Sequence, residues 1–167
     1  EDEFGITIPA ERMQKVNMVI GTFFAETGNE LIKLLAAGDP ASGRLNESLV
    51  AGKDWDAAAF ADARAGLAAH PFTADAVTTD MPALYTFLSS RRDFLLRLLE
   101  NPVLLEHESF TELLRAVFHL TEELRHRRDL SGLPETDSAH LSGDIRRVYG
   151  QLVLQWLDYM EYLNTSY

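Results

Sequence analysis

The sequence predicts an all-α fold, an antiparallel bundle of about five helices that forms a single domain over residues 1–167. Composition is the first reason: 25 Leu and 19 Ala stand against 8 Val and 5 Ile, and unbranched side chains favour helices whereas β-branched ones favour strands. Periodicity is the second reason, because apolar residues recur every three or four positions in separate stretches, as in amphipathic helices. Gly, Pro and Asp between these stretches predict where the helices end.

The first predicted helix runs from Pro9 to Gly38. Pro9 fits the first turn, where its missing N–H costs nothing, and Gly38 suits a left-handed C-terminal cap. Before this helix, Ile6–Ile8 predicts a short strand at most. After it, residues 39–52 predict a loop with at most one helical turn at 46–50. The apolar stripe of the helix contains Met13, Val16, Ile20, Phe23, Phe24, Leu31, Leu34 and Leu35.

Two helices are predicted in the middle of the chain. The second helix spans Trp55–Ala69 and is opened by Lys53 or Asp54. The third helix begins with Asp80 as its cap, and it ends at Asn101-Pro102 because the residue before a proline resists the helical conformation. Its apolar stripe contains Leu84, Phe87, Leu88, Phe94, Leu95, Leu98 and Leu99.

The fourth and last helices complete the predicted bundle. The fourth begins with Ser109 and Glu112, which have capping-box spacing, and ends in the basic cluster Arg125–Arg128, which is favourable near a helix C-terminus. The last helix is capped within residues 136–138 and extends to Leu163. Apolar residues occupy most of its circumference, which is typical of a helix at the centre of a bundle or of one that faces another chain. Both interpretations stay open.

The apolar stripes predict the core, and the last helix predicts an interface. If that helix faces another chain, Leu154, Leu157 and Tyr162 lie in the contact of a weak homodimer. Residues at the middle of each stripe should be buried. This predicted core consists of Phe24, Leu31, Phe94, Leu98, Val117, Leu120, Leu152 and Trp156.

The fourth helix carries the richest set of metal-ligand side chains. Glu123 and His126 have the Glu-x-x-His spacing of carboxylate-bridged di-iron bundles, and His119 lies one turn earlier. Di-iron sites need inward-facing ligands from several helices, whereas both histidines are predicted to face sideways or outward. The sequence therefore predicts no cofactor, and His119, Glu123 and His126 are the candidates if a metal does bind.

The first helix contains a carboxylate whose position predicts partial burial. Glu26 lies close to the edge of the apolar stripe, between Phe24 and Leu31. A half-buried carboxylate needs a cationic partner. The sequence predicts an ion pair across the bundle with Arg115, Arg146 or Arg147.

Charge and composition exclude several functions. Acidic residues outnumber basic ones by 26 to 15, for a formal net charge of −11, which argues against binding to nucleic acid or anionic lipid. The chain has no cysteine, which excludes disulfides, thiolate catalysis and Cys-ligated metals. No apolar run approaches the roughly 18 residues that a membrane span requires. No phosphate-binding loop or nucleophile elbow is present, so catalysis is not predicted.

Three blocks of sequence carry a resemblance to a known family. They are Val16–Gly28, Arg92–Leu124 and Asp144–Leu163. As a set they resemble the helical soluble portion of prokaryotic membrane-anchored proteins of uncharacterised function, in which a short hydrophobic region precedes the domain. The resemblance implies that the 167 residues are excised from a longer protein, that a transmembrane segment precedes Glu1, and that the domain lies on the cytoplasmic face of the membrane. It supplies no reaction and does not cover residues 36–79.

Two functional hypotheses follow. The first is a non-enzymatic interaction or sensory domain tethered to a membrane, which the apolar last helix and the lack of a nucleophile favour. The alternative is a metal-binding helical-bundle enzyme or metal sensor that uses Glu and His of the fourth helix.

Overall fold

The computed structural model describes residues 10–43, 55–127 and 129–166, and within these ranges the protein is all-α with no strand. The predicted fold class is confirmed. The strand predicted at residues 6–8 and the helical turn predicted at 46–50 lie outside the described residues. None of the helices in the described ranges combines the length and the apolar character that crossing a membrane requires.

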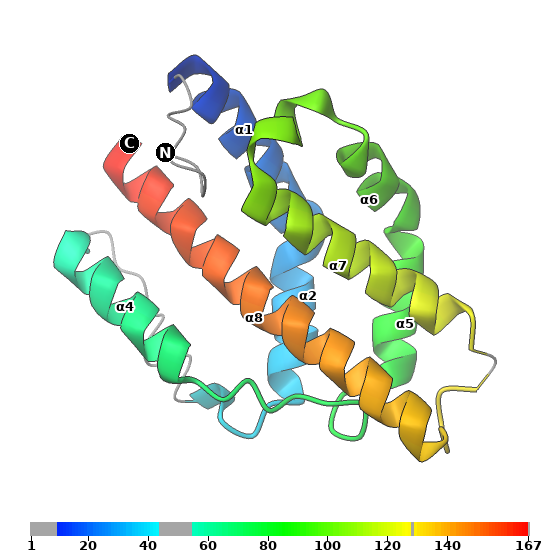
Figure 1. Ribbon diagram of the computed structural model, residues 1–167. Coiled ribbons are helices and arrows are strands. Elements are labelled where there is room, and N and C mark those ends of the chain that lie inside the picture. Colours follow the sequence, from blue (N-terminus) through cyan, green and yellow to red (C-terminus); the bar gives the residue numbers. More distant parts are fainter. Residues whose placement is uncertain (1–9, 44–54, 128, 167) are drawn as a thin grey trace.

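The first predicted helix is a continuous helical run of three elements (Figure 1). The π-helical segment η1 interrupts the α-helical hydrogen-bond register between α1 and α2. The elements are α1 (Ala10–Phe23), η1 (Phe24–Gly28), α2 (Asn29–Ala37), α4 (Ala57–Ala69), α5 (Met81–Ser90), α6 (Arg92–Leu99), the 3-10 helix η2 (Pro102–Glu106), α7 (Glu108–Arg125) and α8 (Glu135–Ser166).

Side-chain caps define the starts of three α-helices in the described ranges, and two of them differ from the prediction. Asp80 caps α5 as predicted, by accepting a hydrogen bond from the backbone N–H of Ala83 at 3.1 Å. The cap of α4 is Asp56, not Lys53 or Asp54. The cap of α7 is His107, whose Nδ1 accepts from the N–H of Phe110, so the predicted capping box at Ser109 is wrong.

The third predicted helix is broken into α5 and α6 at Arg91. The Nε of Arg91 donates to the backbone carbonyl of Glu26 in η1 at 2.9 Å. The break between α5 and α6 is therefore hydrogen-bonded to the π-helical segment of the first helical run. The side chain of Glu26 is exposed. The predicted buried ion pair of Glu26 is therefore wrong, because its surroundings leave the carboxylate in water, where no partner is required.

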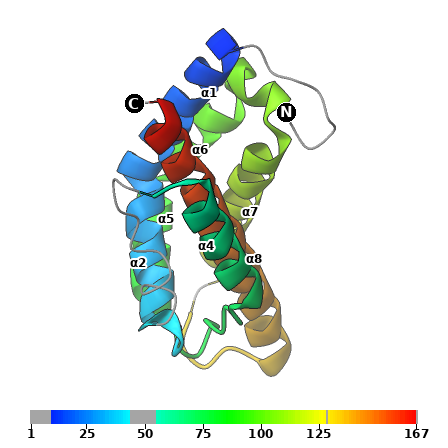
Figure 2. The same ribbon diagram turned by 90° about the vertical axis from the view of Figure 1, so that its left-hand side faces the viewer.

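Helix α8 lies at the centre of the fold and packs against α1, α2, α4 and α7 (Figures 1 and 2). This arrangement favours the central-helix interpretation of its apolar circumference. Leu157 is fully buried, so its predicted place in an exposed interface is wrong. Leu154 is 44% exposed and Tyr162 is half-buried, so these two remain accessible to a partner.

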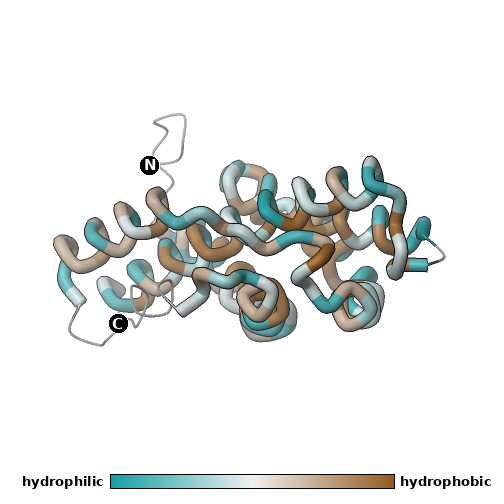
Figure 3. Tube along the Cα trace, turned by 90° about the horizontal axis from the view of Figure 1, so that it is seen from below, coloured by the Kyte–Doolittle hydropathy of each residue, from teal (hydrophilic) through white to brown (hydrophobic). Residues whose placement is uncertain are grey.

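The core contains six of the eight side chains predicted for it, and Phe94 and Trp156 are only half-buried. In α6 the buried side chains are Leu95 and Leu98, and Phe94 packs at the edge of the core. On α8, Val153 and Leu157 are buried by the helices that pack against it, whereas Trp156 is only partly covered. Polar and apolar residues alternate along the helices (Figure 3), as partly exposed helices require.

A glycine is needed at position 38, at the end of α2, for a different reason from the predicted one. Its φ of −91° is not left-handed, but a Cβ there would lie 2.9 Å from Thr79 Oγ1 and 3.0 Å from the backbone carbonyl of Thr78. We expect Gly38→Ala to destabilise the protein by about 1–3 kcal/mol, because backbone must move. Urea denaturation measures this change. Gly143→Ala, where nothing lies within 4 Å, should stabilise by up to about 1 kcal/mol, and equal effects of the two variants would contradict the explanation.

Candidate metal centre

Two pairs of metal-ligand side chains face each other across the antiparallel helices α7 and α8. His119 and Glu123 lie on α7, and His140 and Asp144 lie on α8. Each pair is separated by four residues, which places both side chains on one helix face. The short connection between the helices brings the last turns of α7 beside the first turns of α8 (Figure 1). We call these four residues the His–carboxylate cluster.

The distances within the His–carboxylate cluster are short and nearly equal. His119 Nε2 lies 3.6 Å from Glu123 Oε1 and 3.5 Å from Asp144 Oδ2. His140 Nε2 lies 3.8 Å from Glu123 Oε1 and 3.4 Å from Asp144 Oδ2. Donor atoms of His119, Glu123 and His140 all lie within 4.8 Å of one another. Each imidazole nitrogen thus sits between two carboxylate oxygens.

The nitrogen–oxygen separations are close to those between neighbouring ligands of a bound Zn²⁺ ion. Zn²⁺ binds His nitrogen and carboxylate oxygen at about 2.0–2.2 Å, so adjacent ligand atoms of a tetrahedral site lie about 3.3–3.5 Å apart. The four nitrogen–oxygen distances, 3.4–3.8 Å, are close to that value.

Asp144 provides an independent reason to expect a ligand. Its side chain is only 6% exposed, and its Oδ2 atom is buried without a hydrogen-bond partner. A buried carboxylate oxygen without a hydrogen bond is costly. The same atom is the one that points between the two histidines, so an ion at that position would satisfy it.

The second oxygen of each carboxylate contacts an arginine. Arg127 Nη1 donates to Glu123 Oε2 at 2.8 Å, and Arg147 Nη1 lies 3.5 Å from Asp144 Oδ1. The hydrogen bond from Arg127 is the main reason that the pKa of Glu123 lies below its ordinary value. Glu123 is therefore ionised and holds Oε1 towards the histidines.

Of the three candidate ligands chosen from the sequence, the structure brings two together. His119 and Glu123 belong to the cluster, whereas the exposed His126 contacts the carbonyl of Glu122 through Nδ1 and lies apart. Sequence reasoning missed His140 and Asp144. Their four-residue spacing at the start of the last helix, opposite the end of the fourth, was the available signal.

A second polar cluster is buried where the segments after α2 and α4 meet α8. The carboxylate of Asp39 accepts hydrogen bonds from Tyr149 Oη at 2.7 Å and Thr73 Oγ1 at 2.9 Å, and its Oδ2 lies 2.7 Å from His70 Nε2. The side chains of Asp39 and His70 are 0% and 5% exposed. Because a substrate cannot reach these groups, we interpret the Asp39 cluster as structural.

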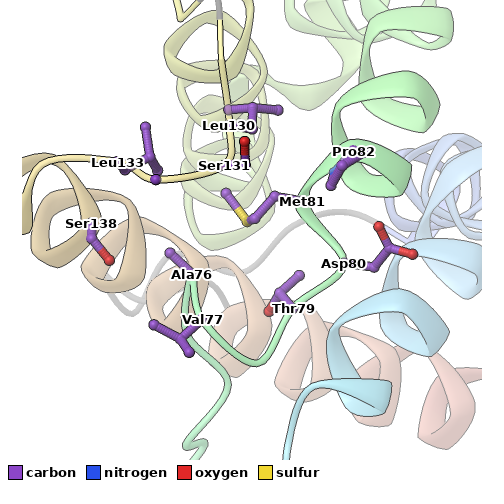
Figure 4. Close-up of a pocket in the computed structure, with 11 residues that line it drawn as sticks. Ala76, Val77, Thr79, Asp80, Met81, Pro82, Leu130, Ser131, Leu133 and Ser138 are labelled. Atoms are coloured by element: carbon purple, nitrogen blue, oxygen red, sulfur yellow. The ribbon is translucent and has the colours of Figure 1, made fainter.

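The surface also has a depression of about 430 Å³ between residues 76–82 and the connection that precedes α8 (Figure 4). Ala76, Met81 and Leu133 contribute apolar walls. Asp80 is the one titratable residue in its lining, and that carboxylate already caps α5. The other polar side chains of the lining are the hydroxyls of Thr79, Ser131 and Ser138, so among the described residues the depression offers a ligand no charged group beyond this capping carboxylate.

Comparisons with known proteins agree on one family. Residues 12–167 match the family described as "Uncharacterized protein MJ1433, C-terminal helical domain". A relative from Methanocaldococcus jannaschii, the uncharacterized protein MJ1433, is 44% identical over 155 residues, which cover 93% of this chain and 62% of the relative. The chain thus spans less than two thirds of that relative's length. No solved structure matches the chain. Both sequence matches lead to one conclusion: this chain belongs to the family of the C-terminal helical domain of MJ1433.

Proposed function

We propose that this is a sensory domain that binds one divalent transition-metal ion in the His–carboxylate cluster. The observation that carries the proposal is that ligand atoms of His119, Glu123 and His140 lie within 4.8 Å of one another. Beside them Asp144 Oδ2 lies 3.4–3.5 Å from both histidines, buried and lacking a hydrogen bond. Two neutral imidazoles and two carboxylates carry a charge of about −2, which a divalent ion neutralises.

The chemistry of the ligands selects among ions. Imidazole nitrogen suits Zn²⁺, Ni²⁺, Cu²⁺ and Fe²⁺, whereas Ca²⁺ and Mg²⁺ require a shell of oxygen ligands. The nitrogen–oxygen separations of 3.4–3.8 Å favour Zn²⁺ among these. Because the ligands come from two helices, a bound ion would tie the end of α7 to the start of α8. The domain would then respond to metal by a change in the stability of that end of the bundle.

Calorimetric titration of metal-free protein with Zn²⁺ tests the proposal. We expect one equivalent to bind and no comparable binding of Mg²⁺. At about 100 times the dissociation constant, Zn²⁺ should add about 2.7 kcal/mol to the free energy of unfolding and raise the melting temperature by about 5–10 °C. His140→Ala should weaken binding on the order of 100-fold, because loss of a direct ligand costs at least as much as loss of its supporting partners.

His126→Ala is the matched control, since His126 is an exposed histidine of the same region outside the cluster. It should bind Zn²⁺ as the wild type does. Equal weakening by His126→Ala and His140→Ala, or no stoichiometric binding by the wild type, would contradict the proposal. The expectation from sequence that no cofactor binds would then stand.

The cellular setting of the domain is a separate part of the proposal. The resemblance to membrane-anchored proteins supports a tether preceding residue 1 and a cytoplasmic location for the domain. Fractionation of cells that express the full-length gene product tests the tether, because a tethered protein sediments with membranes until detergent is added. Recovery in the soluble fraction would contradict the tether and leave the metal proposal intact.

A further inference from the structure

Arg127 is placed to control the geometry of the His–carboxylate cluster without binding the ion. Its Nη1 donates both to Oε2 and to the backbone carbonyl of Glu123, at 2.8 and 2.6 Å. Its Nη2 lies 3.6 Å from Asp137 Oδ1 in the first turn of α8. The side chain is only 16% exposed. Arg127 therefore links the two helices immediately beside the cluster.

Because of this contact, the two carboxylate oxygens of Glu123 have different partners. Oε2 is held by the guanidinium, and Oε1 is the atom near His119 and His140. A carboxylate fixed in this way presents one oxygen to an ion and loses little rotational freedom when the ion binds. Arg147 makes the corresponding contact with Asp144 at 3.5 Å, but its side chain is 60% exposed, so it holds its carboxylate less firmly.

Two effects of Arg127 on metal binding oppose each other. Its positive charge repels a cation close by and weakens binding. Its hydrogen bonds orient Glu123 and strengthen binding. The arginine is largely buried and bonds to both the side chain and the backbone of Glu123, so we expect the fixed orientation to outweigh the repulsion.

We propose that Arg127 is a positioning residue of the metal centre, which holds Glu123 so that Oε1 alone faces the ion. This inference rests on the proposed function, because it assigns a supporting residue to the same site. It predicts that removing a positive charge beside the site weakens the binding of a cation, the opposite of what the charge alone would do.

Zn²⁺ titration of Arg127→Met tests the inference. We expect the dissociation constant to rise about 10–100-fold, as for other residues that orient metal ligands. Co²⁺ in place of Zn²⁺ gives a second readout, because its visible absorption bands should change when Glu123 reorients. Arg127→Lys keeps the charge and one donor, so it should have an intermediate affinity, and it serves also if the Met variant is unstable without metal.

Arg125→Met is the matched control, because Arg125 lies two residues away on α7 and its Nη1 is 3.5 Å from Glu122, not from Glu123. It should bind Zn²⁺ as tightly as the wild type or slightly more tightly. In a Glu123→Gln background, Arg127→Met should have little further effect, because the two residues act through one contact. Unchanged or tighter binding by Arg127→Met would overturn this inference alone. Absence of binding by the wild type would overturn it together with the proposed function.

Discussion

Leu157→Glu is expected to unfold the protein or to destabilise it by at least about 4 kcal/mol. Leu157 is fully buried at the centre of the bundle on α8, and a carboxylate there would lose its water without gaining a charged partner. Circular dichroism during urea denaturation measures the loss. A folded variant within about 1 kcal/mol of the wild type would mean that α8 does not occupy the centre of the fold in solution.

Leu154→Glu is the matched control on the same helix. Leu154 is 44% exposed, so a carboxylate at that position stays hydrated and should change the free energy of unfolding by no more than about 0.5 kcal/mol. This variant also tests the predicted weak homodimer, because it alters an accessible apolar residue and leaves the fold intact. Light scattering should then show less increase of mass with concentration than for the wild type.

Asp39→Ala is expected to destabilise the protein by about 3–5 kcal/mol. The substitution would leave Tyr149 Oη, Thr73 Oγ1 and His70 Nε2 without the carboxylate that now joins them, and removal of one partner from a buried polar cluster is strongly unfavourable. Tyr149→Phe removes a single donor and should cost only about 1.5–3 kcal/mol. Urea denaturation compares the two, and a smaller loss for Asp39→Ala than for Tyr149→Phe would contradict the structural role of the Asp39 cluster.

The contribution of Asp39 should also depend on pH. Burial raises the pKa of Asp39, but the hydrogen bonds from His70, Tyr149, Ala41 and Thr73 outweigh it, so the pKa lies below the ordinary value of 3.8. A lowered pKa stabilises the folded state above the unfolded-state pKa, and this stabilisation is lost as pH falls through the folded-state pKa. The difference in unfolding free energy between the wild type and Asp39→Ala should therefore shrink below about pH 4.

The helices could be predicted from sequence because their signals are local. Asp80 indicates the start of α5 because it caps the first turn of that helix, and the basic residues after Leu124 indicate the end of α7. The caps at Asp56 and His107 were missed because neighbouring polar residues offered equally good local alternatives. The break at Arg91 has no local signal, since the arginine finds its partner, the carbonyl of Glu26, 65 residues away.

Two of the four residues of the candidate metal centre could be predicted from sequence, because their signal is also local. His119 and Glu123 lie on one face of one helix, and sequence spacing identifies them. Their outward position argued against a site until the structure placed His140 and Asp144 opposite them. An exposed histidine becomes a candidate ligand only when a second helix brings a donor to it.

By itself the sequence determined that the described chain is all-α, because helix preference, capping and periodicity act within a few residues. It also determined that α8 is apolar over most of its circumference. It did not decide whether this surface packs in the core of the same chain or against another chain. The tertiary structure alone decided that Leu157 is buried and Leu154 exposed, and that His119 faces His140. These outcomes depend on how each helix is rotated against its neighbours, which packing among residues far apart in the sequence decides.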